Sequence, residues 1–356
     1  MKWLGVLLFS ACIVAPAAAQ SGYPNRPVTL IVTSAPGGVT DVTGRALAQG
    51  LTEAWGRPVI VENKGGAAHI IGAGAVAKSP PDGYTLLVGE SGTFAVNPTL
   101  IPKDKVPYDT EKDFLPISGL VRIYQSLLAA KSLPVANAAE LIALAKREPD
   151  RLTYGTAGVG TALHMNGELF ARMAGIHLVS VHYGGAAPAL NDLIGGSINT
   201  MIVSVALGLP AYRAGQIKML GVGAPKRMPL VSDVPTISES GLPGYQATAW
   251  FGLFAPAGTP NAVVMKIDKE VIRIFSDPAF RERFLDPQMF ESMAGPPDDF
   301  AAFVKAERAK WAKLICGRRH KNRKRPDTRL GEVNPPNDVR RSALPREPTS
   351  LSAIIC

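Results

Sequence analysis

The chain has 356 residues, 46% of them hydrophobic, and a formal net charge of +9. Its length exceeds what one hydrophobic core usually serves, so we expect two lobes. The charge does not indicate nucleic-acid binding, because residues 316–356 hold ten Lys/Arg against four acidic residues, and no Phe, Trp or Tyr that could stack on bases.

The N-terminal residues have the pattern of a cleaved signal peptide over 1–19. Lys2 precedes an apolar run, 3–14, that is too short to span a bilayer, and the small residues at 17–19 provide a cleavage site. The pattern therefore predicts a periplasmic protein. Two alternatives remain open: a lipoprotein signal in which Cys12 carries the lipid, and a buried N-terminal helix.

Cysteine occurs at positions 12, 316 and 356, so the stretch 20–315 contains none. This stretch therefore has neither a disulfide framework nor a thiolate metal site. A cysteine-free body also suits an oxidising compartment.

Strand and helix patterns alternate through the first third of the chain. A β-rich apolar run at 28–33 predicts a buried strand, and apolar residues at helical spacing over 42–55 predict a helix capped by Thr40 or Asp41. The next elements are a strand at 59–61, a helix at 70–77, a strand at 84–88 and a loop at 89–93. Such alternation is typical of a parallel sheet with helical crossovers.

The same alternation restarts further along the chain. We expect, in order, a strand at 126–130, a helix at 138–146, a strand at 152–154, a loop at 155–161, a helix at 162–173, a strand at 178–181, a helix at 186–194, a strand at 198–203, a helix at 205–213, strands at 217–222 and 249–254, and a last helix ending at Ile315. Two such units predict an α/β fold of two lobes with mainly parallel sheets, a hinge and a cleft between them. Lobe one would comprise 20–125 and 246–315, lobe two 126–245, and 316–356 would form a disordered basic tail.

Two glycine loops, each between a strand and a helix, are the candidate binding elements. In the first, Ser34 to Asp41, backbone N–H groups and the helix dipole favour an anion, and Gly37 and Gly38 allow close approach of the backbone. The second runs from Gly155 to Thr161. Either loop alone is more often a plain tight connection. Their pairing, one from each lobe, favours a carboxylate ligand.

Catalytic and metal-binding constellations are absent from the sequence. The segment Gly89 to Thr93 resembles a nucleophile elbow but has threonine in place of the last glycine, and no His belongs to an H-E-x-x-H motif. We therefore expect no enzyme activity, no metal and no cofactor. His164 is a further candidate, because it falls in the first turn of the helix after the second loop. It either points into the cleft to contact the ligand or lies on the helix surface.

The chain resembles the extracytoplasmic solute receptors of tripartite tricarboxylate transporters, the Bug (TctC-like) family. The matching stretches include YPNRPVTLIVTSAPGGVTDVTGRALA and LTYGTAGVGTALHMNGELF. Together they comprise 23–48, 57–67, 80–98, 106–118, 152–170, 184–196, 233–245 and 250–260, in the family's order and spacing.

This resemblance implies a periplasmic-binding-protein-like fold and capture of a small organic carboxylate by backbone and hydroxyl groups. The implied ligand-binding residues are those of the two loops, with one residue after the third strand and one after a lobe-two strand: Ser34, Ala35, Gly37, Gly38, Thr40, Asp41, Ser91, Thr156, Ala157, Gly160, Thr161, His164 and Ser204. The implied partners are the membrane subunits of the transporter, and we expect a monomer. A ligand sensor for a membrane signalling system is the alternative function.

Three departures from the family pattern matter. Val203 stands where many members have aspartate, which argues against an amino-acid ligand, because a buried ammonium would have no partner there. Tyr124 and Gln125 stand where many members have proline and asparagine, and would change the cleft wall. The tail after Ile315 extends beyond the usual family ending, and its Arg- and Pro-rich composition suggests a shifted reading frame; a native disordered tail is the alternative.

Overall fold

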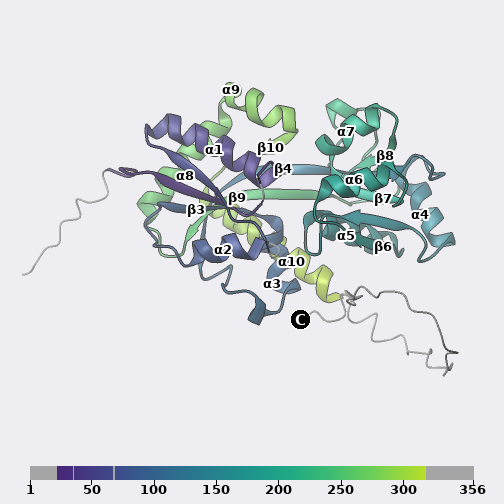
Figure 1. The fold of residues 1–356 in the computed structure, drawn as a ribbon, viewed down its shortest axis with the longest axis horizontal. Helices are drawn as coiled ribbons and strands as arrows, with labels where there is room; N and C mark the ends of the chain where they lie inside the picture. Colours follow the sequence, from purple (N-terminus) through teal and green to yellow (C-terminus); the bar gives the residue numbers. More distant parts are fainter. Residues whose placement is uncertain (1–21, 35, 67–68, 318–356) are drawn as a thin grey trace, which may run out of the picture.

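The computed structural model describes residues 22–34, 36–66 and 69–317, and these segments form two groups of helices and strands (Figure 1). The predicted signal peptide at 1–19, Ala35, and all of the tail except its first two residues lie outside the described residues. Among the described helices, none is both long and apolar enough to cross a membrane.

The first sheet follows the predicted alternation. Strands β1 (Val28–Val32), β2 (Val59–Asn63) and β3 (Thr85–Glu90) are parallel in the order β2-β1-β3. Helices α1 (Val39–Trp55) and α2 (Ile70–Ala77) form the crossovers between them. The carboxyl ends of β1 and β3 therefore lie side by side, each followed by a candidate binding segment.

The second sheet repeats this arrangement. Strands β5 (Thr153–Thr156), β6 (Val179–His182) and β7 (Thr200–Ser204) are parallel, with β5 between the other two. Around them lie α4 (Ala138–Arg147), α5 (Ala162–Ala174), α6 (Ala186–Ile194), α7 (Val205–Arg213) and β8 (Ile217–Val222). The bounds of α7 and β8 agree with those predicted.

One long strand, β4 (Phe114–Ala130), belongs to both sheets. Its first part pairs antiparallel with β9 (Thr248–Pro256) through Tyr124, and from Gln125 onward it pairs with β7 and β8. The chain therefore passes between the sheets along β4, and β4 and β9 occupy the middle of the view (Figure 1).

The sheets are mixed rather than mainly parallel, which corrects the sequence prediction. Strands β9 and β4, and the short β10 (Phe290–Ser292), pair antiparallel with their neighbours. The prediction failed because it located only 126–130 of β4, so the antiparallel centre of the molecule was missed. The predicted loop at 89–93 is also wrong: β3 continues to Glu90, and a π-helical turn, Gly92–Val96, follows and leads into α3 (Asn97–Leu100).

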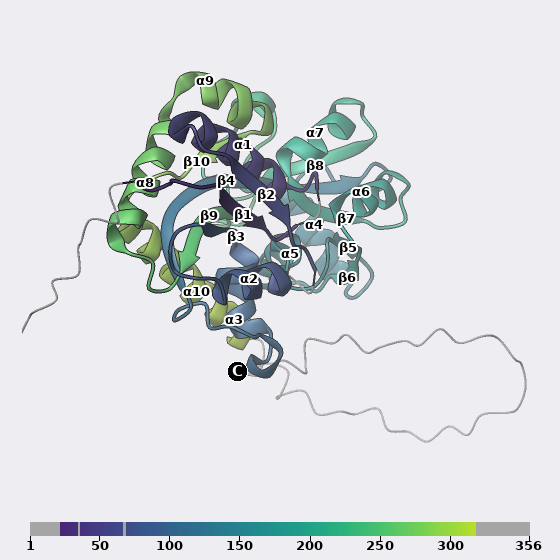
Figure 2. The same cartoon turned by 60° about the vertical axis from the view of Figure 1, so that its left-hand side comes forward.

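Helices cover both faces of each sheet, because strand residues alternate between two cores. In the first sheet, Leu30 and Val32 face a cluster that includes α1 and α8 (Asn261–Ser276), while Ile31 faces the cluster of α2 and α10 (Pro297–Gly317). In the second sheet, one cluster includes α4 and α5 and the other α6 and α7. Figure 2 shows α1 and α8 across the first sheet from α2 and α10, with the short α9 (Pro278–Phe280) after α8.

Gly252 in β9 is required where α10 packs on the sheet. A Cβ at Gly252 would lie 2.0 Å from Phe300 Cζ, and Phe300 is buried. We expect Gly252→Ala to lower the free energy of unfolding by about 1–3 kcal/mol through overpacking. Urea unfolding measures this change. Gly184→Ala is the control, since a Cβ there would meet nothing within 4 Å, and equal stability of the two variants would contradict the prediction.

Candidate ligand-binding site

The second predicted loop meets the segment after β3 at Gly160 and Gly92. A Cβ at Gly92 would lie 3.1 Å from Glu90 Oε1 and 3.4 Å from the carbonyl oxygen of Gly160. A Cβ at Gly160, which has φ +79°, would lie 2.9 Å from the Leu100 side chain and 3.2 Å from Asn97 Oδ1. The segment after β3 and the loop after β5 are therefore in contact, although 68 positions separate the two glycines in the sequence.

In the first loop, Asp41 holds the backbone in place. Helix α1 begins after Gly38, its N-cap, so the predicted capping by Thr40 or Asp41 is wrong: both lie within the first turn. The Asp41 carboxylate instead accepts hydrogen bonds from Gly37 N (2.9 Å) and Asn63 Nδ2 (2.8 Å) and an ion-paired bond from Arg45 Nε (3.0 Å). The Gly37 N–H, a predicted anion donor, is thus already engaged.

The surroundings of Asp41 keep it ionised. Burial favours the neutral acid, but the hydrogen bonds from Arg45, Gly37 and Asn63 outweigh burial and lower the pKa of Asp41. The carboxylate is nearly inaccessible to solvent, with 3% of the residue exposed. Asp41 therefore shapes the first loop, and its charge is compensated by Arg45.

A half-buried ion pair, which sequence reasoning missed, adjoins this loop. His69 Nε2 lies 2.8 Å from Glu90 Oε1, and the Thr40 hydroxyl donates to Glu90 Oε2 at 3.3 Å. His69 Nδ1 lies 2.9 Å from the carbonyl oxygen of Thr33. The signal in the sequence was only the presence of Glu90 beside Ser91, since the partner comes from a segment 21 positions earlier.

The charges of this pair stabilise each other. Burial alone would lower the pKa of His69, but the Glu90 charge and the hydrogen bonds to Glu90 and Thr33 raise it to about 9. Burial would likewise raise the pKa of Glu90, but the charge and hydrogen bond of His69, and the bond from Thr40, lower it. Both groups are therefore ionised at neutral pH.

In the second loop, side-chain hydroxyls fix the backbone. Thr156 Oγ1 accepts from Gly158 N at 3.2 Å and lies 2.7 Å from Nδ1 of His182. Burial lowers the pKa of His182, which the charge of Glu168 opposes. The Nδ1 atom of a neutral His182 can therefore accept a hydrogen bond from the Thr156 hydroxyl. Ala157, between these groups, is partly exposed.

Thr161 caps helix α5. Its hydroxyl donates to the Gly158 carbonyl at 2.8 Å and accepts from His164 N at 3.4 Å. His164 is fully buried, so it neither lies on the helix surface nor presents an accessible ring. Its Nδ1 accepts from Gly160 N at 3.2 Å, and its ring packs against His182 with the centroids 5.1 Å apart. The buried His164 ring thus holds the backbone of the loop in place through Gly160.

The remaining predicted residues lie at or just after the carboxyl ends of strands. Ser91 follows β3 and is 5% exposed, and no hydrogen bond of its hydroxyl occurs within the described part of the chain. Ser204 ends β7, next to β5 in the sheet, and its Oγ accepts from Leu207 N at 3.4 Å to cap α7. Ser34 precedes Ala35, which is not described, and its carbonyl accepts from Asn63 Nδ2.

Two interpretations of the family departures need correction. Val203 is 1% exposed and packs with Leu128 and Met201 in a core. Successive side chains of β7 point to opposite faces of the sheet, and Val203 points to the face that this core covers. It therefore gives no argument against an amine. Gln125 does not form a wall: it is buried at the sheet crossover, where its Oε1 accepts from Asn166 Nδ2 at 2.8 Å.

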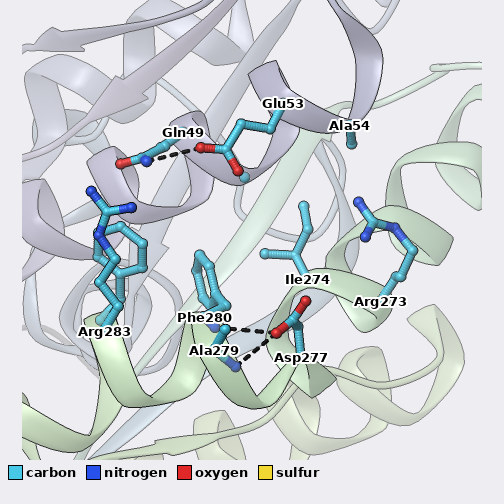
Figure 3. Close-up of a pocket in the computed structure, with 11 residues that line it drawn as sticks. Gln49, Glu53, Ala54, Arg273, Ile274, Asp277, Ala279, Phe280 and Arg283 are labelled. Carbon is cyan, nitrogen blue, oxygen red and sulfur yellow. Dashed lines mark hydrogen bonds between the residues drawn. The ribbon is translucent and has the colours of Figure 1, made fainter.

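A separate cavity of about 330 Å³ lies between α1, the end of α8 and the helical residues that follow α8 (Figure 3). Its charged lining residues include Glu53, Arg273, Asp277 and Arg283, and Asp277 accepts from the backbone of Ala279. None of the predicted site residues lines it, so it is distinct from the candidate site. No group of three or more His, Cys, Asp or Glu side chains within the described ranges could hold a metal ion.

Comparison with known proteins gives the family. Residues 43–319 match the model of the tripartite tricarboxylate transporter family receptor. The chain belongs to this family. The match spans most of the chain and confirms both the family resemblance and the predicted role as a solute-binding receptor.

Solved structures confirm the fold class. The receptor is 36% identical to an R. palustris protein solved with adipate, with a TM-score of 0.75, and 82% of this chain and 97% of that chain are covered. It is 35% identical to the periplasmic binding protein BugD, with a TM-score of 0.72, and 83% of this chain and 98% of that chain are covered. It is 34% identical to MatC from Rhodopseudomonas palustris with bound malate, with a TM-score of 0.73, and 82% of this chain and 99% of that chain are covered. The periplasmic-binding-protein-like α/β fold is thereby confirmed.

The His69–Glu90 pair predicts a pH dependence of stability. The pKa of His69 rises from 6.5 to about 9 on folding, so its contribution is complete below pH 6.5 and is lost as pH rises through 9. The lowered pKa of Glu90 makes its contribution complete above 4.5 and lost in more acidic solution. We expect the receptor to lose at most about 3 kcal/mol of unfolding free energy between pH 6.5 and 9.5 from this source.

Chemical unfolding at pH 6.5 and 9.5 measures this loss. The control is His69→Gln, which lacks the titrating ring and should show a smaller loss over the same interval. An identical loss in the receptor and in the variant would show that His69 does not carry the dependence.

Proposed function

We propose that this receptor binds a small organic carboxylate between the loop before α1 and the loop before α5. The observation that carries the proposal is the convergence of both helix starts on one segment. Thr40, in the first turn of α1, donates to Glu90, and Gly160, just before the N-cap of α5, touches Gly92. Helix N-termini present N–H groups without intrahelical partners, and their dipoles favour negative charge.

The proposed contacts are those assigned from the sequence, divided by role. Gly38 and Thr40 would offer backbone N–H groups on one side. On the other, Gly160 and Thr161 would line the site without donating their N–H groups, because these already bond His164 Nδ1 and the Gly158 carbonyl. Ser91 stands between Glu90, which bonds Thr40, and Gly92, which lies against Gly160. Its buried hydroxyl would donate to the ligand. Asp41, Thr156 and His164 would hold the loops in place rather than touch the ligand. The other assigned residues, Ser34, Ala35, Gly37, Ala157 and Ser204, would complete the surroundings.

The ligands of two related structures, adipate and malate, both carry two carboxyl groups, and they support a dicarboxylate ligand for this chain. Two facing helix N-termini can each take one carboxylate group of such a molecule. An amino acid is not excluded by Val203, since that side chain lies in a core. The charge of Glu90 is already compensated by His69, so a ligand ammonium would compete with an existing partner.

The wider setting is part of the proposal. Lobe one would comprise 20–125 and 246–315 and lobe two 126–245, with the hinge where β4 changes partner after Tyr124. A signal peptide at 1–19 would direct the receptor to the periplasm, where it would act as a monomer and deliver its ligand to the membrane subunits of a tripartite transporter. A sensor role in a signalling system would use the same site.

A screen of acids tests the function. We expect adipate or malate, at 100 times its dissociation constant, to add about 2.7 kcal/mol to the unfolding free energy. The melting temperature should then rise by about 5–10 °C. Differential scanning fluorimetry measures the shift, with 1,6-hexanediol as the control that matches adipate in length but carries no charge. A panel of mono-, di- and tricarboxylates without any shift would refute the proposal.

Thr161→Val tests the lobe-two loop. The valine cannot donate to Gly158 or accept from His164 N, so the loop loses both bonds. We expect affinity for the bound acid to fall about 2- to 12-fold, the equivalent of 0.5–1.5 kcal/mol, while the protein stays folded. Isothermal titration calorimetry measures the change. The matched control is Thr29→Val, near the amino end of β1 and away from the loop that follows this strand. Equal affinities of both variants would remove Thr161 from the site.

A further inference from the structure

Three segments distant in the sequence meet at the His69–Glu90 pair: the connection from β1 to α1, the start of α2 and the end of β3. His69 precedes α2, Glu90 ends β3, Thr33 follows β1 and Thr40 lies in the first turn of α1. The contacts are 2.8 Å from His69 Nε2 to Glu90, 2.9 Å from His69 Nδ1 to the Thr33 carbonyl, and 3.3 Å from the Thr40 hydroxyl to Glu90. The pair thus fastens the start of α1 to the end of β3.

The geometry requires a proton on each ring nitrogen of His69. A carbonyl oxygen can only accept, so Nδ1 must carry a proton to bond Thr33. Nε2 faces a carboxylate, which also accepts when ionised. The ring is therefore an imidazolium opposite a carboxylate, and the raised pKa of His69, about 9, agrees with this reading of the geometry.

The carboxylate of this pair is placed where it would oppose an anionic ligand. The Glu90 side chain is 14% exposed, and Oε1 lies beside Gly92, the residue that touches the Gly160 carbonyl in the second lobe. An uncompensated negative charge so close to both loops would raise the energy of a bound carboxylate, because buried charges are weakly screened. The His69 charge, 20% exposed, cancels it.

We propose that His69 is a positioning and charge-compensating residue of the carboxylate site: it holds Glu90 against Thr40 and removes a negative charge that would repel the ligand. This inference rests on the proposed function. It assigns to the pair a role in affinity and in the pH range of binding, which the stability of the fold alone would not require.

The groups that face the pair are few. Glu90 on β3 is the charged group that faces His69, and the Thr33 carbonyl and Thr40 hydroxyl are the neutral ones. Asp41, the acidic residue next to Thr40, is paired with Arg45 and Asn63 instead. The second lobe contributes the Gly160 backbone. The titration of His69 is therefore governed by Glu90.

Charge-removing variants test the inference. The probes are adipate and malate, titrated by calorimetry at pH 7 into the receptor and into His69→Gln, Glu90→Gln and the double variant. We expect His69→Gln to weaken binding at least about tenfold, because Glu90 is left uncompensated. The double variant should recover most of that loss, since the repelling charge is gone. Glu62→Gln, in the exposed pair with Lys64, is the matched control and should bind normally.

A pH series provides a readout that a merely structural role would not move. Between pH 7 and 10 both acids stay fully ionised. A fall in affinity centred at about pH 9 would therefore report the loss of the proton from His69. Glu90→Gln should show no such fall in that range. Two-dimensional NMR of the histidine rings measures the pKa of His69 directly and should find the ring protonated at pH 8.

The outcomes separate this inference from the proposed function. If the receptor binds no acid of the panel, the proposed function fails and this inference with it. If the receptor binds an acid and His69→Gln binds it equally well, or the double variant binds as weakly as His69→Gln, the inference alone fails. Should His69→Gln not fold, the pH series of the receptor and of Glu90→Gln decides, and a flat affinity through pH 10 overturns it.

Discussion

The backbone hydrogen bonds of β4 set the arrangement of everything else in the molecule. Gln125 N donates to the Ala247 carbonyl, and the Gln125 carbonyl accepts from Gly223 N, at the point where β4 leaves β9 for β7 and β8. The Gln125 side chain also bonds Asn166 of α5. Because a strand's two edges can serve only two neighbours at once, the change of partner forces two sheets. The start of α1 and the loop before α5 then both contact the segment from Glu90 to Gly92.

Within that frame, hydrogen bonds from side chain to backbone keep the loops in place. Asp41 binds the Gly37 N–H, Thr156 binds the Gly158 N–H, and Thr161 bonds Gly158 O and His164 N. Buried polar groups are costly unless they are bonded, so these side chains stabilise one loop conformation over others. Several residues that the sequence suggested as ligand contacts thus have a supporting role in the structure.

Sequence reasoning located the elements that have simple periodicity and missed those that do not. Helix α7 and strand β8 agree with prediction, whereas β4 was recognised only from 126, because its register shifts between Pro116 and Ser118 and between Gly119 and Val121 disturb the alternation. Helix α8 was missed although Val264, Ile267, Val271 and Ile274 share helical spacing. The His69–Glu90 pair could not be predicted, since it depends on which strands lie side by side.

Charge compensation explains how the proposed site for anions can contain acidic residues. Arg45 neutralises Asp41 and His69 neutralises Glu90, so these cations are not available to the ligand. What the two loops can offer is N–H and hydroxyl dipoles, whose attraction for a carboxylate depends on direction as well as distance. Recognition by dipoles requires donors fixed before the ligand arrives, because each freely rotating group would cost entropy on binding. The two ion pairs and the capping hydroxyls serve the same requirement: they hold the donors in one geometry without adding net charge.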